Sequence, residues 1–190
     1  MSRASLVLGL YGGMALGSII LSAGRGDPDL YRLNEEMAAI WLLLSPAAGV
    51  MVALAFVALT RLAVVHFVWA QHLTRSFHDV LGPLSTRDIV IIAVASSVGE
   101  EFLFRGALQP WIGVVPQAVL FALLHVGPGK RFVPWTASAL VMGLGFGWLS
   151  ESTGNLGGAI AAHFTINFLN LRYIVAAREQ REGFLARRSF

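Results

Sequence analysis

The stretch IVIIAVASSVGEEFLFRGAL, residues 89–108, decides the fold of this chain. The residues before Glu100 carry no charge, whereas Glu100, Glu101 and Arg105 lie in the second half. An apolar helix of about 20 residues crosses the hydrocarbon core of a bilayer. A charged side chain at that depth costs about 3 kcal/mol even on a lenient scale, so such residues normally face a bundle interior and have a function. The stretch therefore predicts a transmembrane helix that carries part of a buried polar site.

Composition places the rest of the chain in the same class. Of the 190 residues, 56% are hydrophobic and only 13% are charged, whereas soluble domains are about one quarter charged. A soluble domain of this length could not hide so much apolar surface in one small core. We therefore expect an all-α polytopic membrane bundle. The chain has no cysteine, which excludes disulfides, thiolate metal sites and a cysteine nucleophile.

About six apolar segments follow one another without a linker long enough to separate domains, so residues 1–190 are expected to form one integral-membrane domain. The fourth segment is short and contains Pro116, which predicts a half-span or a tilted helix. A further apolar patch at residues 62–70 either prolongs the second helix or lies along the interface. The six segments are residues 4–23, 38–60, 89–108, 111–127, 134–150 and 157–176.

The first segment allows two interpretations. Its end, Ser22-Ala23-Gly24, is typical of a signal-peptide cleavage site. The segment is nevertheless long for the apolar region of a signal peptide and close to the length of a membrane span. We favour a helix that is retained.

Lysines and arginines predict the orientation, because they concentrate in cytoplasmic loops. With the N-terminus inside, almost all of them fall on the inner side, and the acidic residues of the loop at 27–36 fall outside. Both termini are then cytoplasmic, and the alanine- and arginine-rich spans favour a bacterial cell membrane. The net charge of +3 and the pI near 10.0 suit anionic lipid headgroups better than nucleic acid. The inner residues are Arg3, Arg61, Arg75, Arg87, Lys130, Arg131, Arg172, Arg178, Arg181, Arg187 and Arg188.

Polar residues of three segments are expected to meet near the bilayer midplane. Arg105 follows Glu101 by four residues and can offset its charge on the same helical face, while Glu100 points about 100° away. The rise of a helix places Glu100 about 16 Å from the inner end of its segment, and Asn167 about 15 Å from the outer end of the last one. His163 precedes Asn167 by one turn, and His125 ends the fourth segment's FALLH.

This set of side chains suits the hydrolysis of an amide by water. A buried carboxylate is a competent general base, and an imidazole shares or relays the proton. A neutral imidazole N–H and an amide N–H are donors for the oxyanion of a tetrahedral intermediate.

Three motifs in order carry a family resemblance: EEFLFRG at 100–106, FALLH at 121–125 and HFTIN at 163–167. Over about residues 89–170 the chain resembles the CPBP (CAAX protease and bacteriocin-processing, or Abi) family of intramembrane endopeptidases. The resemblance implies a glutamate-dependent protease that cleaves a membrane-associated protein tail or peptide. It implies that Glu100 and His125 activate water, that His163 and Asn167 hold the oxyanion, and that Glu101 and Arg105 brace the site.

Several alternatives stay open. Two histidines and a glutamate also suit a catalytic zinc, although we favour no cofactor because asparagine is not a usual zinc ligand. The Glu101–Arg105 pair is expected to hold helices together, and Asn167 could instead form an interhelical hydrogen bond. Gly143, Gly145 and Gly147 are expected to allow close helix approach rather than bind phosphate. A non-catalytic sorting or regulatory partner and a proton-coupled transporter are the other function classes.

Overall fold

The computed structural model describes residues 3–27 and 29–188, with side chains described up to residue 177. Helices are the only regular secondary structure in these residues, which confirms the all-α prediction. The elements are α1 (Arg3–Arg25), α2 (Trp41–His66), α3 (Val68–Leu81), α4 (Thr86–Glu101), the π-helix η1 (Phe102–Leu108), α5 (Gln109–Ile112), α6 (Val114–Leu123), the 3-10 helix η2 (Lys130–Phe132), α7 (Val133–Thr153) and α8 (Gly157–Arg188).

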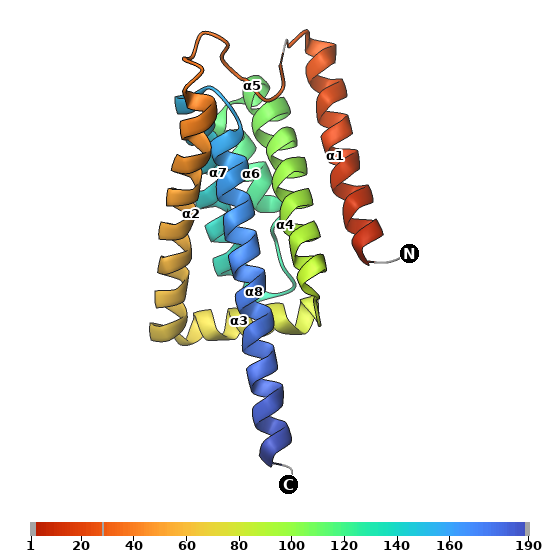
Figure 1. Ribbon diagram of the computed structural model, residues 1–190, viewed down its shortest axis with the longest axis vertical. Helices are drawn as coiled ribbons and strands as arrows, with labels where there is room; N and C mark the ends of the chain where they lie inside the picture. Colours follow the sequence, from red (N-terminus) through yellow and green to blue (C-terminus); the bar gives the residue numbers. More distant parts are fainter. Residues whose placement is uncertain (1–2, 28, 189–190) are drawn as a thin grey trace.

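Helices α2, α4, α7 and α8 lie alongside one another, and α1 packs against α4 and η1 (Figure 1). Small residues allow the close contact of α2 with α8: Ala53, Ala159 and Ala162 are fully buried. A Cβ atom added to Gly49 would collide with the backbone of Gly158. This use of alanine and glycine at helix contacts is typical of membrane bundles, where close packing replaces the hydrophobic effect.

The outward surface of the bundle is apolar, as the composition predicts. On α2, Leu43, Met51 and Val65 are 74%, 69% and 70% exposed. Three of the described helical segments, α1, α2 and Lys130–Thr153, are long and apolar enough to cross a membrane. An exposed apolar surface of this extent is explained by contact with lipid, so the protein is an integral membrane protein. The predicted fourth span is the short α6, and Pro116 lies in its first turn, where no intrahelical donor is lost.

The loops assigned by charge to one side do lie at one end of the bundle. Arg3 donates a hydrogen bond to the Pro83 carbonyl before α4, at 2.9 Å, and η2 contacts α3. At the opposite end, the loop after α1 pairs with the turn before α8, through Asn34 N to Gly154 O at 3.1 Å. The structure therefore agrees with the grouping of the loops, and the side of the membrane stays a prediction.

Each of the two alternatives expected for the apolar patch at residues 62–70 applies to one half of it. Its first half prolongs α2 as far as His66. Phe67 then adopts an extended conformation (φ −123°, ψ 126°), and α3 turns away to lie across the end of the bundle (Figure 1). Val68 and Trp69 at its start are exposed, as expected of a helix in the interface.

The glycines of α7 were predicted to permit close helix approach, and two of the three do so. A Cβ on Gly143 would lie 3.0 Å from Ala118 Cβ of α6, and one on Gly147 would lie 2.8 Å from the side chains of Gln109 and Gln117. The prediction is wrong for Gly145, because nothing lies within 4 Å of a Cβ there.

Candidate active site

The two glutamates lie where α4 changes into a π-helix. The helix begins at a capping box in which Ser85 and Asp88 exchange hydrogen bonds, and it runs regularly to Glu101. The wider π turns then extend from Phe102 to Leu108. Glu100 is 8% exposed and Glu101 is fully buried. Single π-helical turns inside α-helices often mark functional sites.

Glu101 Oε1 of α4 accepts hydrogen bonds from side chains of two other helical segments, η1 and α8. It accepts a hydrogen bond from Arg105 Nη1 at 2.9 Å and another from His163 Nδ1 of α8 at 2.7 Å. Arg105 is itself fully buried, and its Nη2 donates to the Gly143 carbonyl of α7 at 3.3 Å. Its guanidinium lies 4.4 Å from the centre of the Phe121 ring, within cation–π distance. The predicted Glu101–Arg105 pair is therefore present, and His163 is an additional, unpredicted partner.

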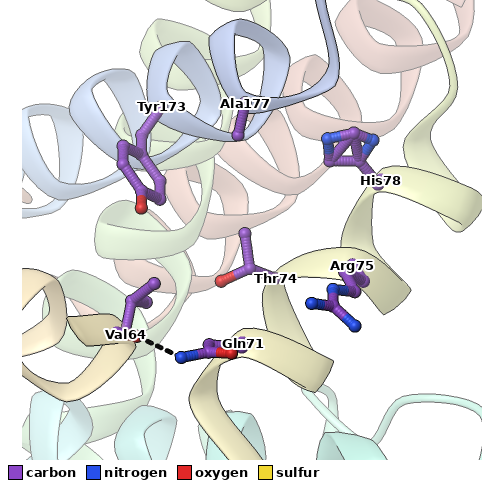
Figure 2. A pocket seen from close by; sticks show the side chains of 7 residues that line it. All are labelled: Val64, Gln71, Thr74, Arg75, His78, Tyr173 and Ala177. Atoms are coloured by element: carbon purple, nitrogen blue, oxygen red, sulfur yellow. Dashed lines mark hydrogen bonds between the residues drawn. The ribbon is translucent and has the colours of Figure 1, made fainter. Parts of the chain in front are cut away.

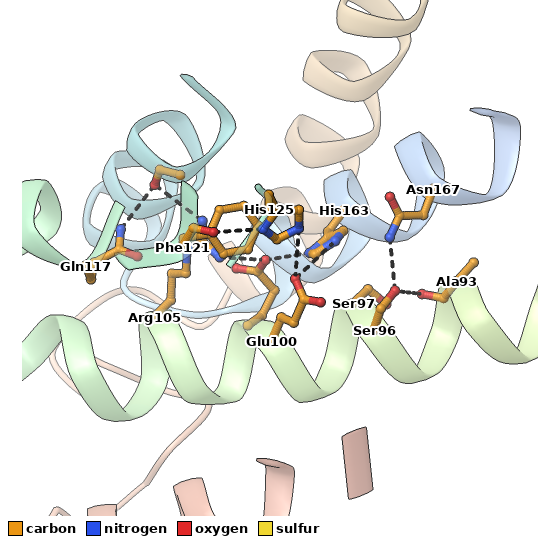
Figure 3. Close-up of polar contacts among 12 residues, drawn as sticks. Ala93, Ser96, Ser97, Glu100, Arg105, Gln117, Phe121, His125, His163 and Asn167 are labelled. Carbon is orange, nitrogen blue, oxygen red and sulfur yellow. Dashed lines mark hydrogen bonds and ion pairs between the residues drawn. The ribbon is translucent and has the colours of Figure 1, made fainter. Parts of the chain in front are cut away.

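Glu100 faces both histidines (Figure 3). Its Oε2 lies 3.7 Å from His125 Nε2 and 3.8 Å from His163 Nε2. These side chains come from α4, from the turn that follows α6, and from α8. Three separate elements thus bring a carboxylate and two imidazoles together, as the sequence predicts.

The hydrogen bonds of the Nδ1 atoms determine what the Nε2 atoms can do. His125 Nδ1 lies 2.7 Å from the Phe121 carbonyl, which can only accept, so this nitrogen carries the proton. His163 Nδ1 donates to the Glu101 carboxylate in the same way. In a neutral imidazole Nε2 is then an acceptor. Both Nε2 lone pairs and Glu100 Oε2 consequently point towards one shared space, which suits a donor such as water.

Asn167 reaches α4 but contacts Ser96, not Glu100. Its Nδ2 donates to Ser96 Oγ at 2.9 Å, and Ser96 precedes Glu100 by one helical turn. The interhelical hydrogen bond considered from the sequence is therefore present. An amide nitrogen carries two N–H groups, so one donor of Asn167 is still available for a ligand.

The same three acceptor atoms allow a test of the zinc alternative. Both histidines hydrogen-bond through Nδ1 to an oxygen, as metal-bound histidines usually do. However, bonds of about 2 Å to a tetrahedral zinc place its ligand atoms roughly 3.3 Å apart, and the observed separations are 3.7 and 3.8 Å. Within residues 3–27 and 29–188, no group of three or more histidine and acidic side chains has the arrangement of a metal site. The present spacing fits zinc poorly.

Tyr11 of α1 lies next to the site, and it was not predicted from the sequence. Its hydroxyl lies near the Glu100 side chain, and a Cβ on Gly99 would lie 2.8 Å from the Tyr11 carbonyl oxygen. The glycine directly before the glutamate pair was the available signal for this close approach. Gln117 is a second missed residue: it donates to the Gly143 carbonyl at 3.1 Å, beside Arg105, and was visible as a polar residue in an apolar segment.

Comparison with known proteins gives matches to the part of the chain that holds this site. Residues 82–169 match the Rce1-like family, described as type II CAAX prenyl endopeptidase Rce1-like. The chain is similar to the uncharacterized protein YpbD of Bacillus subtilis (strain 168), with 35% identity over 82 residues. That alignment covers 42% of this chain and 41% of YpbD. Solved structures gave no significant match. The family resemblance predicted from the three motifs is thereby confirmed.

Proposed function

We propose that this chain, whose residues 82–169 belong with the Rce1-like CAAX endopeptidases, hydrolyses a peptide bond of a membrane-associated protein or peptide. One observation carries the proposal: Glu100 Oε2 lies 3.7 Å from His125 Nε2 and 3.8 Å from His163 Nε2, in a buried place formed by two helices and the turn after α6. Separations of this length are commonly bridged by water. Water held by a carboxylate and an imidazole is the nucleophile that peptide hydrolysis needs.

In the first step Glu100, assisted by His125, takes a proton from the water. The water oxygen bonds to the carbonyl carbon of the substrate, and the electron pair of the C=O double bond moves to the carbonyl oxygen. When this intermediate collapses, the C–N bond breaks and the leaving nitrogen receives the proton held by Glu100. The C=O double bond re-forms as the C–N bond breaks, so one water is consumed and a carboxylic acid and an amine are formed. A positioned general base contributes about 10²- to 10⁴-fold to such a reaction.

His163 and Asn167 are proposed to hold the oxyanion. His163 Nδ1 already donates to Glu101, so Nε2 can donate to the oxyanion only when the ring is an imidazolium, which takes up a proton from solvent before the reaction and keeps it throughout. Asn167 contributes the N–H that Ser96 does not use. Glu101, with Arg105, is therefore assigned a positioning role that keeps His163 oriented.

The proposed setting is a bacterial cell membrane with both termini in the cytoplasm. Arg3, Arg75 and Lys130 belong to elements at the same end of the bundle, which the positive-inside rule places in the cytoplasm. The similarity to a Bacillus subtilis protein also supports a bacterial source. The proposed substrates are C-terminal segments of membrane proteins or membrane-bound peptides, without nucleic acid.

The proposal is tested with Glu100→Gln, which keeps the shape of the side chain and removes the base. We expect the C-termini of membrane proteins in cells that carry this variant to match those of cells without the enzyme. The parent and the control Glu151→Gln, an exposed residue at the end of α7, should yield the processed termini. Equal amounts of each variant in the membrane are required. Processing by Glu100→Gln at the parental rate would refute the assignment of the base.

A zinc-dependent version of the same protease is the alternative, favoured by the oxygen partners of both Nδ1 atoms. Glu100, His125 and His163 are the residues that would hold the ion, at separations longer than those of zinc ligands. This version requires stoichiometric zinc in the purified protein and loss of processing with a tight chelator. Parental processing by chelator-treated, zinc-free protein would eliminate it.

A further inference from the structure

A cavity lined by polar and apolar side chains lies at the end of the bundle where α3 crosses it (Figure 2). Its volume is about 290 Å³, and it opens between the end of α2, α3 and the inner part of α8. The lining residues are Val64, Gln71, Thr74, Arg75, His78, Tyr173 and Ala177. None of them belongs to the site around Glu100, so the cavity calls for its own explanation.

Among the side chains described, up to residue 177, the lining offers hydrogen-bond donors and positive charge and contains no carboxylate. Arg75 forms no ion pair with any side chain that the structure describes. The guanidinium of Arg61 lies over the Tyr173 ring, 3.9 Å from the ring centre. The Tyr173 hydroxyl points into the cavity (Figure 2). Arg61 does not line the cavity, and its Nη2 donates to the Leu169 carbonyl at 3.1 Å, but it adds a second positive charge next to Tyr173. Such a set of donors is suited to an anion that accepts several hydrogen bonds.

The position of the cavity relative to the membrane surface indicates which anion is available to it. Helix α3 runs across the end of the bundle (Figure 1) and exposes Val68, Trp69 and Val80. A helix with exposed apolar residues beside basic ones lies at the boundary between acyl chains and headgroups. The cavity above α3 therefore opens at the level of lipid phosphates, and basic pockets between transmembrane helices at this level bind anionic headgroups.

We propose that this cavity is a binding site for the phosphate group of an anionic phospholipid. Arg75 contacts the phosphate, the Tyr173 hydroxyl donates a hydrogen bond to it, and Arg61 strengthens the local positive potential from behind the tyrosine ring. The site is independent of the proposed protease reaction, because it shares no residue with it.

The test measures binding of short-chain phosphatidylglycerol to the full-length protein in a neutral detergent, by calorimetry. We expect saturable binding of one lipid per protein, and about tenfold weaker binding to Arg75→Gln, because one charge-assisted hydrogen bond is lost. The matched control is Arg87→Gln, which removes an exposed arginine from the same end of the bundle, outside the cavity. Tyr173→Phe keeps the ring under Arg61 and should weaken binding severalfold without altering the unfolding temperature.

Inorganic phosphate is titrated in parallel, to distinguish the phosphate of a lipid headgroup from a free phosphate compound. Binding of phosphatidylglycerol that phosphate displaces only at much higher concentration assigns the site to lipid. Phosphate binding as tight as lipid binding, and equally sensitive to Arg75→Gln, assigns it to a free phosphate compound instead and overturns the lipid source. Absence of saturable binding, or an equal loss in Arg87→Gln, overturns the site, since a general surface charge would then account for the attraction.

Discussion

Replacing Glu101 by Gln should destabilise the protein strongly, although the change removes only one charge. Glu101 and Arg105 are both completely buried, and Arg105 Nη1 lies 2.9 Å from Glu101 Oε1. Removal of one partner of a buried ion pair leaves the other charge uncompensated, which costs about 3 to 5 kcal/mol. For a chain of this size, each kcal/mol lowers the unfolding temperature by about 2 to 4 °C. We therefore expect a decrease on the order of 10 °C.

The measurement is thermal unfolding of the purified variants in one detergent, followed by circular dichroism. The double variant Glu101→Gln/Arg105→Met should recover a large part of the loss, because no unpaired charge remains. Glu151→Gln, with its exposed side chain, should unfold within about 2 °C of the parent. If Glu101→Gln unfolded at the parental temperature, the buried carboxylate would not be compensating Arg105, and our account of the pair would be wrong.

Three further outcomes are expected. Gly147→Ala should cost about 1 to 3 kcal/mol in unfolding experiments, because its Cβ would meet side chains at 2.8 Å; Gly145→Ala, with open space around it, is the control and should be neutral. Tyr11→Phe should slow processing about tenfold with unchanged unfolding, because it removes the hydroxyl that lies near the proposed base; parental rates would exclude a role for the hydroxyl. Hydrogen bonds from Ser85 hold the pKa of Asp88 below its ordinary value, so its contribution to stability is present above that value and is lost as pH falls through the lowered pKa. Asp88→Asn should therefore be less stable than the parent at pH 7 and lose less between pH 5 and pH 3 in the same unfolding assay.

Much of the site could be predicted because the relevant spacings are local. The four-residue interval between Glu101 and Arg105 fixes their contact through helix geometry, and the same interval puts His163 and Asn167 on one face of α8. Absence of charge around them indicates depth in the membrane. These arguments need no knowledge of tertiary packing.

Contacts between helices could not be derived in this way. Whether His163 meets Glu101 or Glu100 depends on the rotation of α8 relative to α4, and the π turns after Glu101 change the direction of every later side chain in that segment. The pairing of Asn167 with Ser96 depends on the same rotation. Tyr11 was missed for a simpler reason: a single tyrosine in an apolar segment carries no periodic signal, and Gly99 indicates a close approach without identifying the residue that approaches.

The double acceptor at Glu101 Oε1 has a consequence for the proposed reaction. One oxygen holds both the Arg105 guanidinium and the His163 ring in place, so a change in the protonation of Glu100 requires neither side chain to move. The guanidinium of Arg105 stays fixed meanwhile, because the Gly143 carbonyl and the Phe121 ring hold it from other directions. In the proposed reaction a proton can therefore pass from water through Glu100 to the leaving nitrogen while the surrounding side chains keep their positions.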